Sequence, residues 1–122
     1  MDQNVLDDLL GRFVADLGAT VSSANVVVGD RLGLYRGLAG AGPATSAELA
    51  DRTGTAERYV REWLRGQAAG GYVSYDPGTD RYALTEEQAL AFADPAGLAL
   101  PGAFQLAAAC FRELDPITTA FR

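Results

Sequence analysis

The chain has 122 residues, of which 48% are hydrophobic and 21% are charged, and its formal net charge is −6. This length and composition fit one globular domain with a single core and exclude a disordered or fibrous chain. The absence of histidine and the presence of one cysteine exclude histidine-based catalytic triads, an intrachain disulfide and the usual structural zinc sites.

The N-terminal third predicts long helices. Residues 4–38 carry apolar side chains close to helical spacing, which fits one long helix or two consecutive helices with a break at Gly18 or Gly29. The apolar residues are more numerous than one helix face needs, so a second surface must cover them. We therefore expect residues 1–43 to form a homodimer. Four residues are expected to have no partner inside the chain and to form the dimer interface: Leu10, Val14, Val26 and Val27.

Residues 44–94 carry the pattern of a winged helix-turn-helix. Thr45 and Glu48 have the spacing of a capping box, which predicts that a helix begins immediately after Thr45. Gly54 can take the left-handed conformation that turns the chain, and Thr55 can cap the next helix. The pattern therefore predicts two short helices joined by a tight turn.

The second of these helices is predicted over residues 56–69. Its apolar residues recur at helical spacing and form a stripe that we expect to face the core: Tyr59, Val60, Trp63, Leu64 and Ala68. Residues 72–84 have the pattern of a strand, a turn and a strand, which would form the wing. Thr85 and Gln88 repeat the capping-box spacing and open a helix that must end before Pro95.

The last segment, residues 95–122, includes a predicted helix over residues 102–114. Its apolar run is too short and too interrupted to span a bilayer, and the chain does not begin with a secretory signal. Together with the single cysteine, this favours a cytoplasmic protein that does not enter a membrane. All ten basic residues are arginine, which indicates a bacterial genome rich in GC. The predicted fold class is mainly α: a winged helix-turn-helix with long N-terminal helices and a small β-hairpin wing.

No residue of the chain is assigned a catalytic, cofactor-binding or metal-binding role. Carboxylates are adjacent at Asp7-Asp8 and at Glu86-Glu87, but neighbouring residues on a helix point about 100° apart and cannot share a substrate. These pairs are expected to be solvated helix surface and favourable first-turn charges.

Three arginines fall on one stripe of the second helix of the helix-turn-helix: Arg58, Arg61 and Arg65. Such a stripe can meet phosphates or guanine edges in a DNA major groove. Glu57 lies four residues before Arg61, and Glu62 lies four residues after Arg58, so two of the arginines have an intrahelical carboxylate within reach. The acidic net charge also argues against nucleic acid as a partner. A free-standing DNA-binding transcriptional regulator is therefore kept as the alternative hypothesis.

Several runs of the sequence together resemble a known family: residues 29–35, Gly42-Pro43, residues 46–50, Gly54-Thr55, residues 57–64, Gly71-Tyr72 and residues 75–77. They are similar to the N-terminal winged-helix domain of bacterial class I S-adenosylmethionine-dependent methyltransferases. The resemblance extends from about Leu10 to Ala93.

The resemblance implies an accessory domain that precedes a Rossmann-like catalytic domain. It implies dimerisation and help in closing the pocket of a small-molecule substrate, and it does not imply DNA binding. The glycine-rich loop that holds S-adenosylmethionine in that family has no counterpart here, so the cofactor is expected only in the full-length protein. Residues 95–122 are then expected to lead toward a missing catalytic domain, and the chain to be a fragment.

Overall fold

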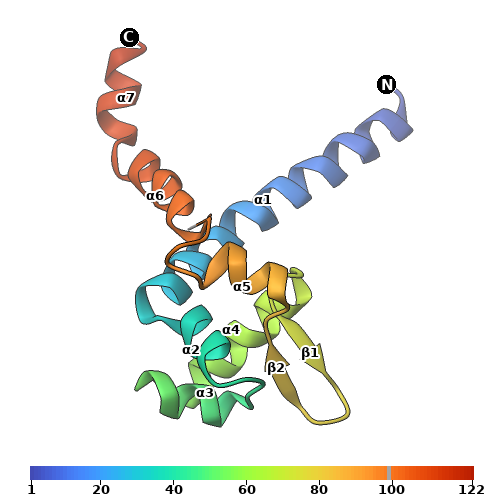
Figure 1. Ribbon diagram of the computed structural model, residues 1–122. Helices are drawn as coiled ribbons and strands as arrows, with labels where there is room; N and C mark the ends of the chain where they lie inside the picture. The colour runs from blue at the N-terminus through green and yellow to red at the C-terminus, as the bar shows by residue number, and fades with distance from the viewer. Residues whose placement is uncertain (99) are drawn as a thin grey trace.

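The computed structural model describes residues 1–98 and 100–122, and its fold is a mainly α winged helix-turn-helix, as predicted (Figure 1). The elements follow in the order α1 (Gln3–Leu32), α2 (Leu34–Gly40), α3 (Ser46–Thr53), α4 (Glu57–Ala69), β1 (Ser74–Asp76), β2 (Arg81–Ala83), α5 (Glu86–Phe92), the 3₁₀ helix η1 (Leu100–Phe104), α6 (Gln105–Arg112) and α7 (Leu114–Ala120). Helices α2 to α5 and the hairpin form the compact body. The N-terminal part of α1 and the pair α6 and α7 leave this body as two diverging arms.

The long N-terminal helix breaks at Gly33, and the predicted break at Gly18 or Gly29 is wrong. Helix α1 runs without interruption through both of those glycines. Gly33 has a φ of 71°, in the left-handed region that glycine adopts without strain, and its N–H caps α1 by bonding the carbonyl of Asp30. The chain therefore turns into α2 after α1 has crossed the body.

The helix-turn-helix consists of α3 and α4. Both halves of the predicted capping box are present at the start of α3, where Thr45 Oγ1 accepts the Glu48 N–H and the Glu48 carboxylate accepts the Thr45 N–H. Gly54 takes the left-handed conformation, as predicted. The predicted cap at Thr55 is wrong, because Ala56 is the N-cap of α4 and the Thr55 hydroxyl is bonded to that of Thr53 instead.

The wing is the antiparallel hairpin β1–β2, in which Tyr75 pairs with Tyr82. Their ring centroids lie 4.7 Å apart, so the cross-strand pair itself stabilises the short hairpin. A backbone bridge from Ala44 to Tyr82 attaches the wing to the segment before α3. Helix α5 begins with the second predicted capping box, at Thr85 and Gln88.

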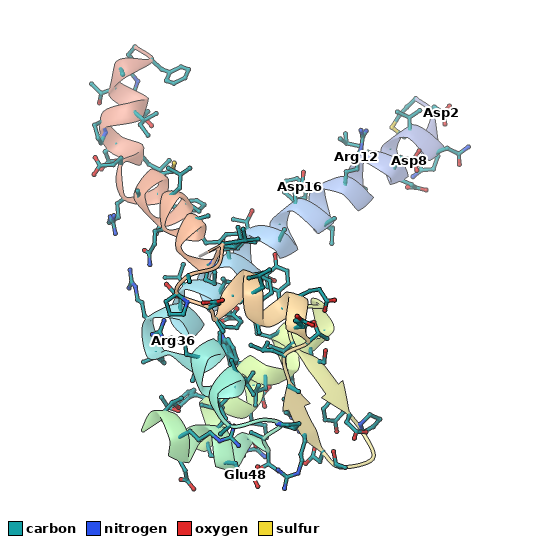
Figure 2. All side chains as sticks on the ribbon, in the orientation of Figure 1. Asp2, Asp8, Arg12, Asp16, Arg36 and Glu48 are labelled. Atoms are coloured by element: carbon teal, nitrogen blue, oxygen red, sulfur yellow. The ribbon has the colours of Figure 1, made fainter. Side chains whose placement is uncertain are left out.

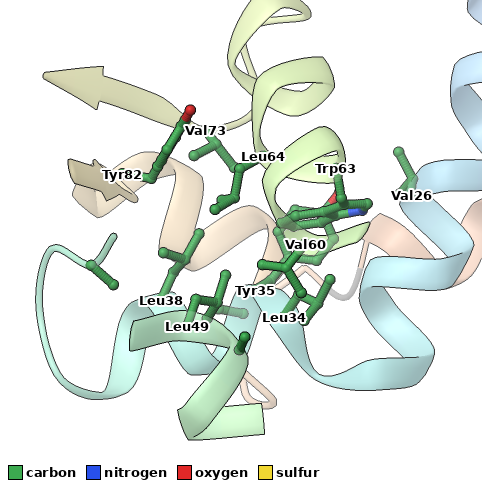
Figure 3. Close-up of a cluster of buried hydrophobic side chains, with 13 residues drawn as sticks. Val26, Leu34, Tyr35, Leu38, Leu49, Val60, Trp63, Leu64, Val73 and Tyr82 are labelled. Atoms are coloured by element: carbon green, nitrogen blue, oxygen red, sulfur yellow. The ribbon is translucent and has the colours of Figure 1, made fainter. Parts of the chain in front are cut away.

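The core lies where α2, α3 and α4 meet the end of α1 and the wing (Figure 3). Its largest fully buried side chains include Tyr35, Leu34, Leu38, Leu49 and Leu64. Helix α4 buries Val60, Trp63, Leu64 and Gln67, which recur at helical spacing. Tyr59 lies one position off this stripe and is 77% exposed, so the prediction that it faces the core is wrong.

The C-terminal segment forms two helices where one was predicted over residues 102–114. Helix α6 ends at Arg112, and Glu113 leaves the helical conformation with φ −99° and ψ 15°. Pro116 then lies in the first turn of α7, where its missing N–H costs no hydrogen bond. The chain therefore bends between α6 and α7.

Candidate interaction surfaces

The arginines of α4 are partly occupied by neighbouring carboxylates. Arg61 Nε lies 3.5 Å from Glu57 Oε1, as its spacing predicts. Glu62 lies 3.4 Å from Arg65 Nη1, so it pairs with Arg65 and not with Arg58 as expected. Arg58 is exposed and has no ion-pair partner among residues 1–98 and 100–122. This surface therefore offers little free positive charge.

Two other arginines near the helix-turn-helix are used to hold the body together. Arg81 of the wing makes an ion pair and hydrogen bond with Glu48 of α3. This contact holds the pKa of the Glu48 carboxyl below its usual range. Arg52 donates from Nη1 to the carbonyl oxygens of Gly37 and Gly42, at 3.1 and 2.9 Å, and so fastens α3 to the chain around α2.

The sequence did not reveal these roles of Arg52 and Arg81, since Glu48 and Arg81 are 33 residues apart and no local spacing connects them. Because both arginines are already bonded to groups of the protein, they are not available to contact a polyanion. Because DNA binding draws much of its free energy from cations that replace counterions, the surface is a poor DNA-binding face.

The first arm is the N-terminal part of α1, which extends away from the body with apolar side chains in solvent (Figure 2). Seven large apolar residues of this arm are at least half exposed: Val5, Leu9, Leu10, Phe13, Val14, Leu17 and Val21. Most of them share one side of the helix by the 3.6-residue repeat, while Asp8, Arg12 and Asp16 follow another side. The arm is thus an amphipathic helix that this chain leaves uncovered.

Val26 and Val27 do not belong to that uncovered surface. Val26 is 2% exposed and lies in the core cluster, and Val27 is 8% exposed. The expectation that both residues have no partner inside the chain is therefore wrong. The reason is that α1 crosses the body at this level and is packed on two sides, by α4 and by the segment formed by η1 and α6. Leu10 and Val14 lie further out, and they are 51% and 65% exposed.

The second arm, formed by α6 and α7, also presents apolar side chains to solvent: Leu106, Phe111, Leu114, Ile117 and Phe121. Where this arm meets α1, the two helices border a groove of about 370 Å³ lined by Val27, Val28 and Phe104 among others. Its lining residues come from α1 between Thr20 and Arg31 and from the segment between Phe104 and Arg112. Both arms therefore contribute to one apolar region.

The part of the chain that the structure describes contains no group of three acidic, histidine or cysteine residues that could hold a metal ion. In the same part, no helix is long and apolar enough to cross a membrane.

The fold and these surfaces define a winged helix-turn-helix protein. Residues 19–93 match the Rv2258c-like winged HTH domain, and the chain belongs to that family. No sequence among the curated proteins matches the chain.

Solved structures that are similar to this chain include methyltransferases, whose N-terminal domains match it. The mitomycin 7-O-methyltransferase MmcR matches 98% of this chain with a TM-score of 0.73 and 26% identity, over 35% of its own length. CalO1, a methyltransferase in calicheamicin biosynthesis solved in its SAH-bound form, matches 79% with a TM-score of 0.60 and 31% identity, over 27% of its length. RosA from Streptomyces davawensis, an N,N-8-amino-8-demethyl-D-riboflavin dimethyltransferase, matches 76% with a TM-score of 0.56 and 26% identity, over 27% of its length. The chain thus spans about a third or less of these proteins.

Proposed function

We propose that the chain is the N-terminal accessory domain of an S-adenosylmethionine-dependent methyltransferase, in which it mediates homodimerisation and helps to close the pocket of a small-molecule substrate. The observation that carries the proposal is the match of almost the whole chain, both arms included, to MmcR. A match limited to the winged helix would be shared with DNA-binding proteins of many kinds. The arms make the resemblance more specific.

The exposed arms support the dimer. A side chain such as leucine or phenylalanine contributes roughly 1.5–3 kcal/mol when it moves from full exposure to full burial. Several such residues on α1, including Leu10, Phe13 and Leu17, are about half exposed, as are residues of α7 such as Leu114. Burying them between two chains supplies enough gross free energy to exceed the entropy lost on association. Most of the stability of a helix in a protein comes from packing of its apolar face, so a covering partner would also stabilise the helical arm.

The place of the domain in a longer protein supports the role in pocket closure. The named relatives act on small molecules or belong to the biosynthesis of one, and one of them was solved with SAH. In the full-length protein, S-adenosylmethionine would be held by a catalytic domain outside residues 1–122. This domain would then contribute a wall of the substrate pocket in a cytoplasmic bacterial enzyme.

The dimer is tested by light scattering on the chain and on two variants of α1. Leu10→Asp places a charge in the apolar stripe of the arm, and Ala15→Asp places the same charge on the opposite side of the same helix. We expect a dimer for the unmodified chain and for Ala15→Asp, and a folded monomer for Leu10→Asp. Circular dichroism confirms that both variants keep their helices. A monomeric unmodified chain, or equal behaviour of the two variants, would overturn the proposed dimer.

A further inference from the structure

A wedge-shaped cavity of about 260 Å³ lies between α1 and the C-terminal half of α4. Helix α1 faces it with Ala19, Ser22 and Ser23, and α4 faces it with Gly66 and Gly70. Val26 of α1 and Gln67 of α4 also line the wedge, and the other residues that the two helices present to it are small. A Cβ placed on Gly66 would meet no other atom within 4 Å, apart from its own helix backbone and chain neighbours, which shows how empty the wedge is.

The wedge is open because α1 touches α4 at only one level. Trp63 donates from Nε1 to the Asn25 carbonyl at 2.8 Å, and its ring lies directly against Gly29. A Cβ at Gly29 would be 2.3 Å from Trp63 Cζ2. Helix α1 therefore packs against the Trp63 ring so closely that only glycine fits at this position. From that contact α1 runs away from the body toward its N-terminus (Figure 1), and Ala19 and Ser22, which line the wedge, lie on the N-terminal side of the contact.

One strongly buried polar side chain borders the wedge. Gln67 is 5% exposed, and its Oε1 accepts the hydroxyl of Tyr35. Burial raises the pKa of Tyr35, so this hydroxyl remains a protonated donor. The amide nitrogen of Gln67 makes no side-chain hydrogen bond to residues 1–98 and 100–122, and it is not among the fully buried atoms that lack a partner. This N–H group is therefore open to solvent at the wedge, and a bound acceptor would take the place of water on it.

Aromatic side chains form another part of the wall. Tyr72 and Phe104 both line the wedge. Tyr72 is held in place by Phe92, with ring centroids 4.7 Å apart, and Phe92 in turn packs on Tyr35 at 5.5 Å. Rings fixed in this way offer stacking or edge contacts to another aromatic group. The wedge therefore combines an apolar aromatic wall with the side-chain N–H donor of Gln67.

We propose that this wedge binds a small planar aromatic molecule carrying a hydrogen-bond acceptor such as a carbonyl, with its ring against Tyr72 and Phe104 and its acceptor on Gln67 Nε2. Drug-sized ligands occupy pockets of roughly 300–1,000 Å³, so a cavity just below that range fits a molecule of one ring. The site is complete within this chain. It goes beyond the methyltransferase assignment, and neither proposal depends on the other.

The first experiment compares two probes by NMR of the isotopically labelled chain. Acetophenone offers a carbonyl, and α-methylstyrene has a CH₂ group in place of that oxygen with nearly the same shape. At equal concentrations, acetophenone should shift the side-chain NH₂ resonances of Gln67 and the backbone resonances of Gly66 and Gly70 in a saturable way. Its affinity should exceed that of α-methylstyrene about threefold to tenfold, since one net hydrogen bond differs.

The second experiment fills the wedge. Gly66→Leu projects a side chain into it, while Ala69→Leu adds the same side chain at an exposed position of the same helix. Acetophenone binding should be lost in Gly66→Leu and unchanged in Ala69→Leu. Equal binding of both probes, or binding that survives Gly66→Leu, overturns the proposal. If the unmodified chain binds neither probe and Gly66→Leu instead weakens a dimer, the wedge receives a second copy of the chain, and the proposal is also overturned.

Discussion

Gly29 is the residue at which α1 comes closest to the core. Because a Cβ there would overlap the ring of the almost fully buried Trp63, Gly29→Ala should force α1 away from α4. We expect the free energy of unfolding to fall by about 1–3 kcal/mol, the usual cost of overpacking a core. Urea denaturation followed by the fluorescence of Trp63, the only tryptophan of the chain, measures this change.

Gly18 gives the matched control, because it lies in the same helix and a Cβ there meets nothing within 4 Å. Gly18→Ala should raise the stability by about 0.5–1 kcal/mol through helix propensity alone. A loss of stability at Gly18, or none at Gly29, would contradict the packing described for α1.

Glu48 connects α3 with the wing through Arg81. The guanidinium of Arg81 lowers the pKa of the Glu48 carboxyl in the folded state. Since the folded pKa lies below the unfolded one, the stabilising contribution is present above the unfolded pKa and is lost as the pH falls through the folded pKa. Glu48→Gln should therefore lower the free energy of unfolding at neutral pH, and its difference from the unmodified chain should vanish in acid.

Asp51→Asn is the control for Glu48→Gln. Asp51 is exposed on the same helix and makes no ion pair in the described part of the chain. Its substitution should change stability little at any pH. If Glu48→Gln changed stability at no pH, the role of this residue would be assigned to the capping box alone, since glutamine can also accept the Thr45 N–H.

Helix α4 occupies the position of a recognition helix in a helix-turn-helix, but it does not have the excess positive charge that such a helix needs to bind DNA. Arg61 and Arg65 face carboxylates, and the helix-turn-helix as a whole carries balanced charges. DNA binding should therefore be weak, nearly independent of sequence, and lost by about 150 mM salt. Fluorescence anisotropy at two salt concentrations measures it. Tight, salt-tolerant binding that disappears in Arg58→Ala would instead support a DNA-binding regulator.

The elements that could be predicted from the sequence are those with local signals. The capping boxes at Thr45 and Thr85 fix two helix starts, because the bonded groups are only three residues apart. The turn at Gly54 and the wing were predicted for the same reason. The break at Gly33 was missed because a glycine at position 18, 29 or 33 is equally able to interrupt a helix. Only the packing of α1 in the folded chain decides which of the three ends it.

The candidate surfaces were predictable only in part. The apolar excess of α1 is visible in its periodicity, and it correctly indicates that Leu10 and Val14 lie outside the core. The same reasoning wrongly grouped Val26 and Val27 with Leu10 and Val14. Helical periodicity shows which side of a helix is apolar, but it does not show which part of the helix packs against the rest of the chain. The contacts of Arg81 with Glu48 and of Gln67 with Tyr35 join distant positions of the chain, and the sequence carries no signal for them.

At the scale of the whole molecule, the chain combines a closed winged-helix body with two open apolar arms. The body keeps α1, α2, α4 and the wing in fixed relation. The arms provide surface that the body cannot cover, which is expected of a domain that works in an assembly.

The proposed role of this domain in a methyltransferase requires that the cofactor site lies outside residues 1–122. Titration calorimetry with S-adenosylmethionine tests it on two proteins: this chain, and the product of the entire reading frame that encodes it. The chain alone should give no saturable heat, because residues 1–98 and 100–122 contain no unit of strand, glycine-rich loop and helix that could cradle such a cofactor. The entire product should bind one S-adenosylmethionine per chain. Saturable binding by the 122-residue chain itself, or none by the entire product, would contradict the account.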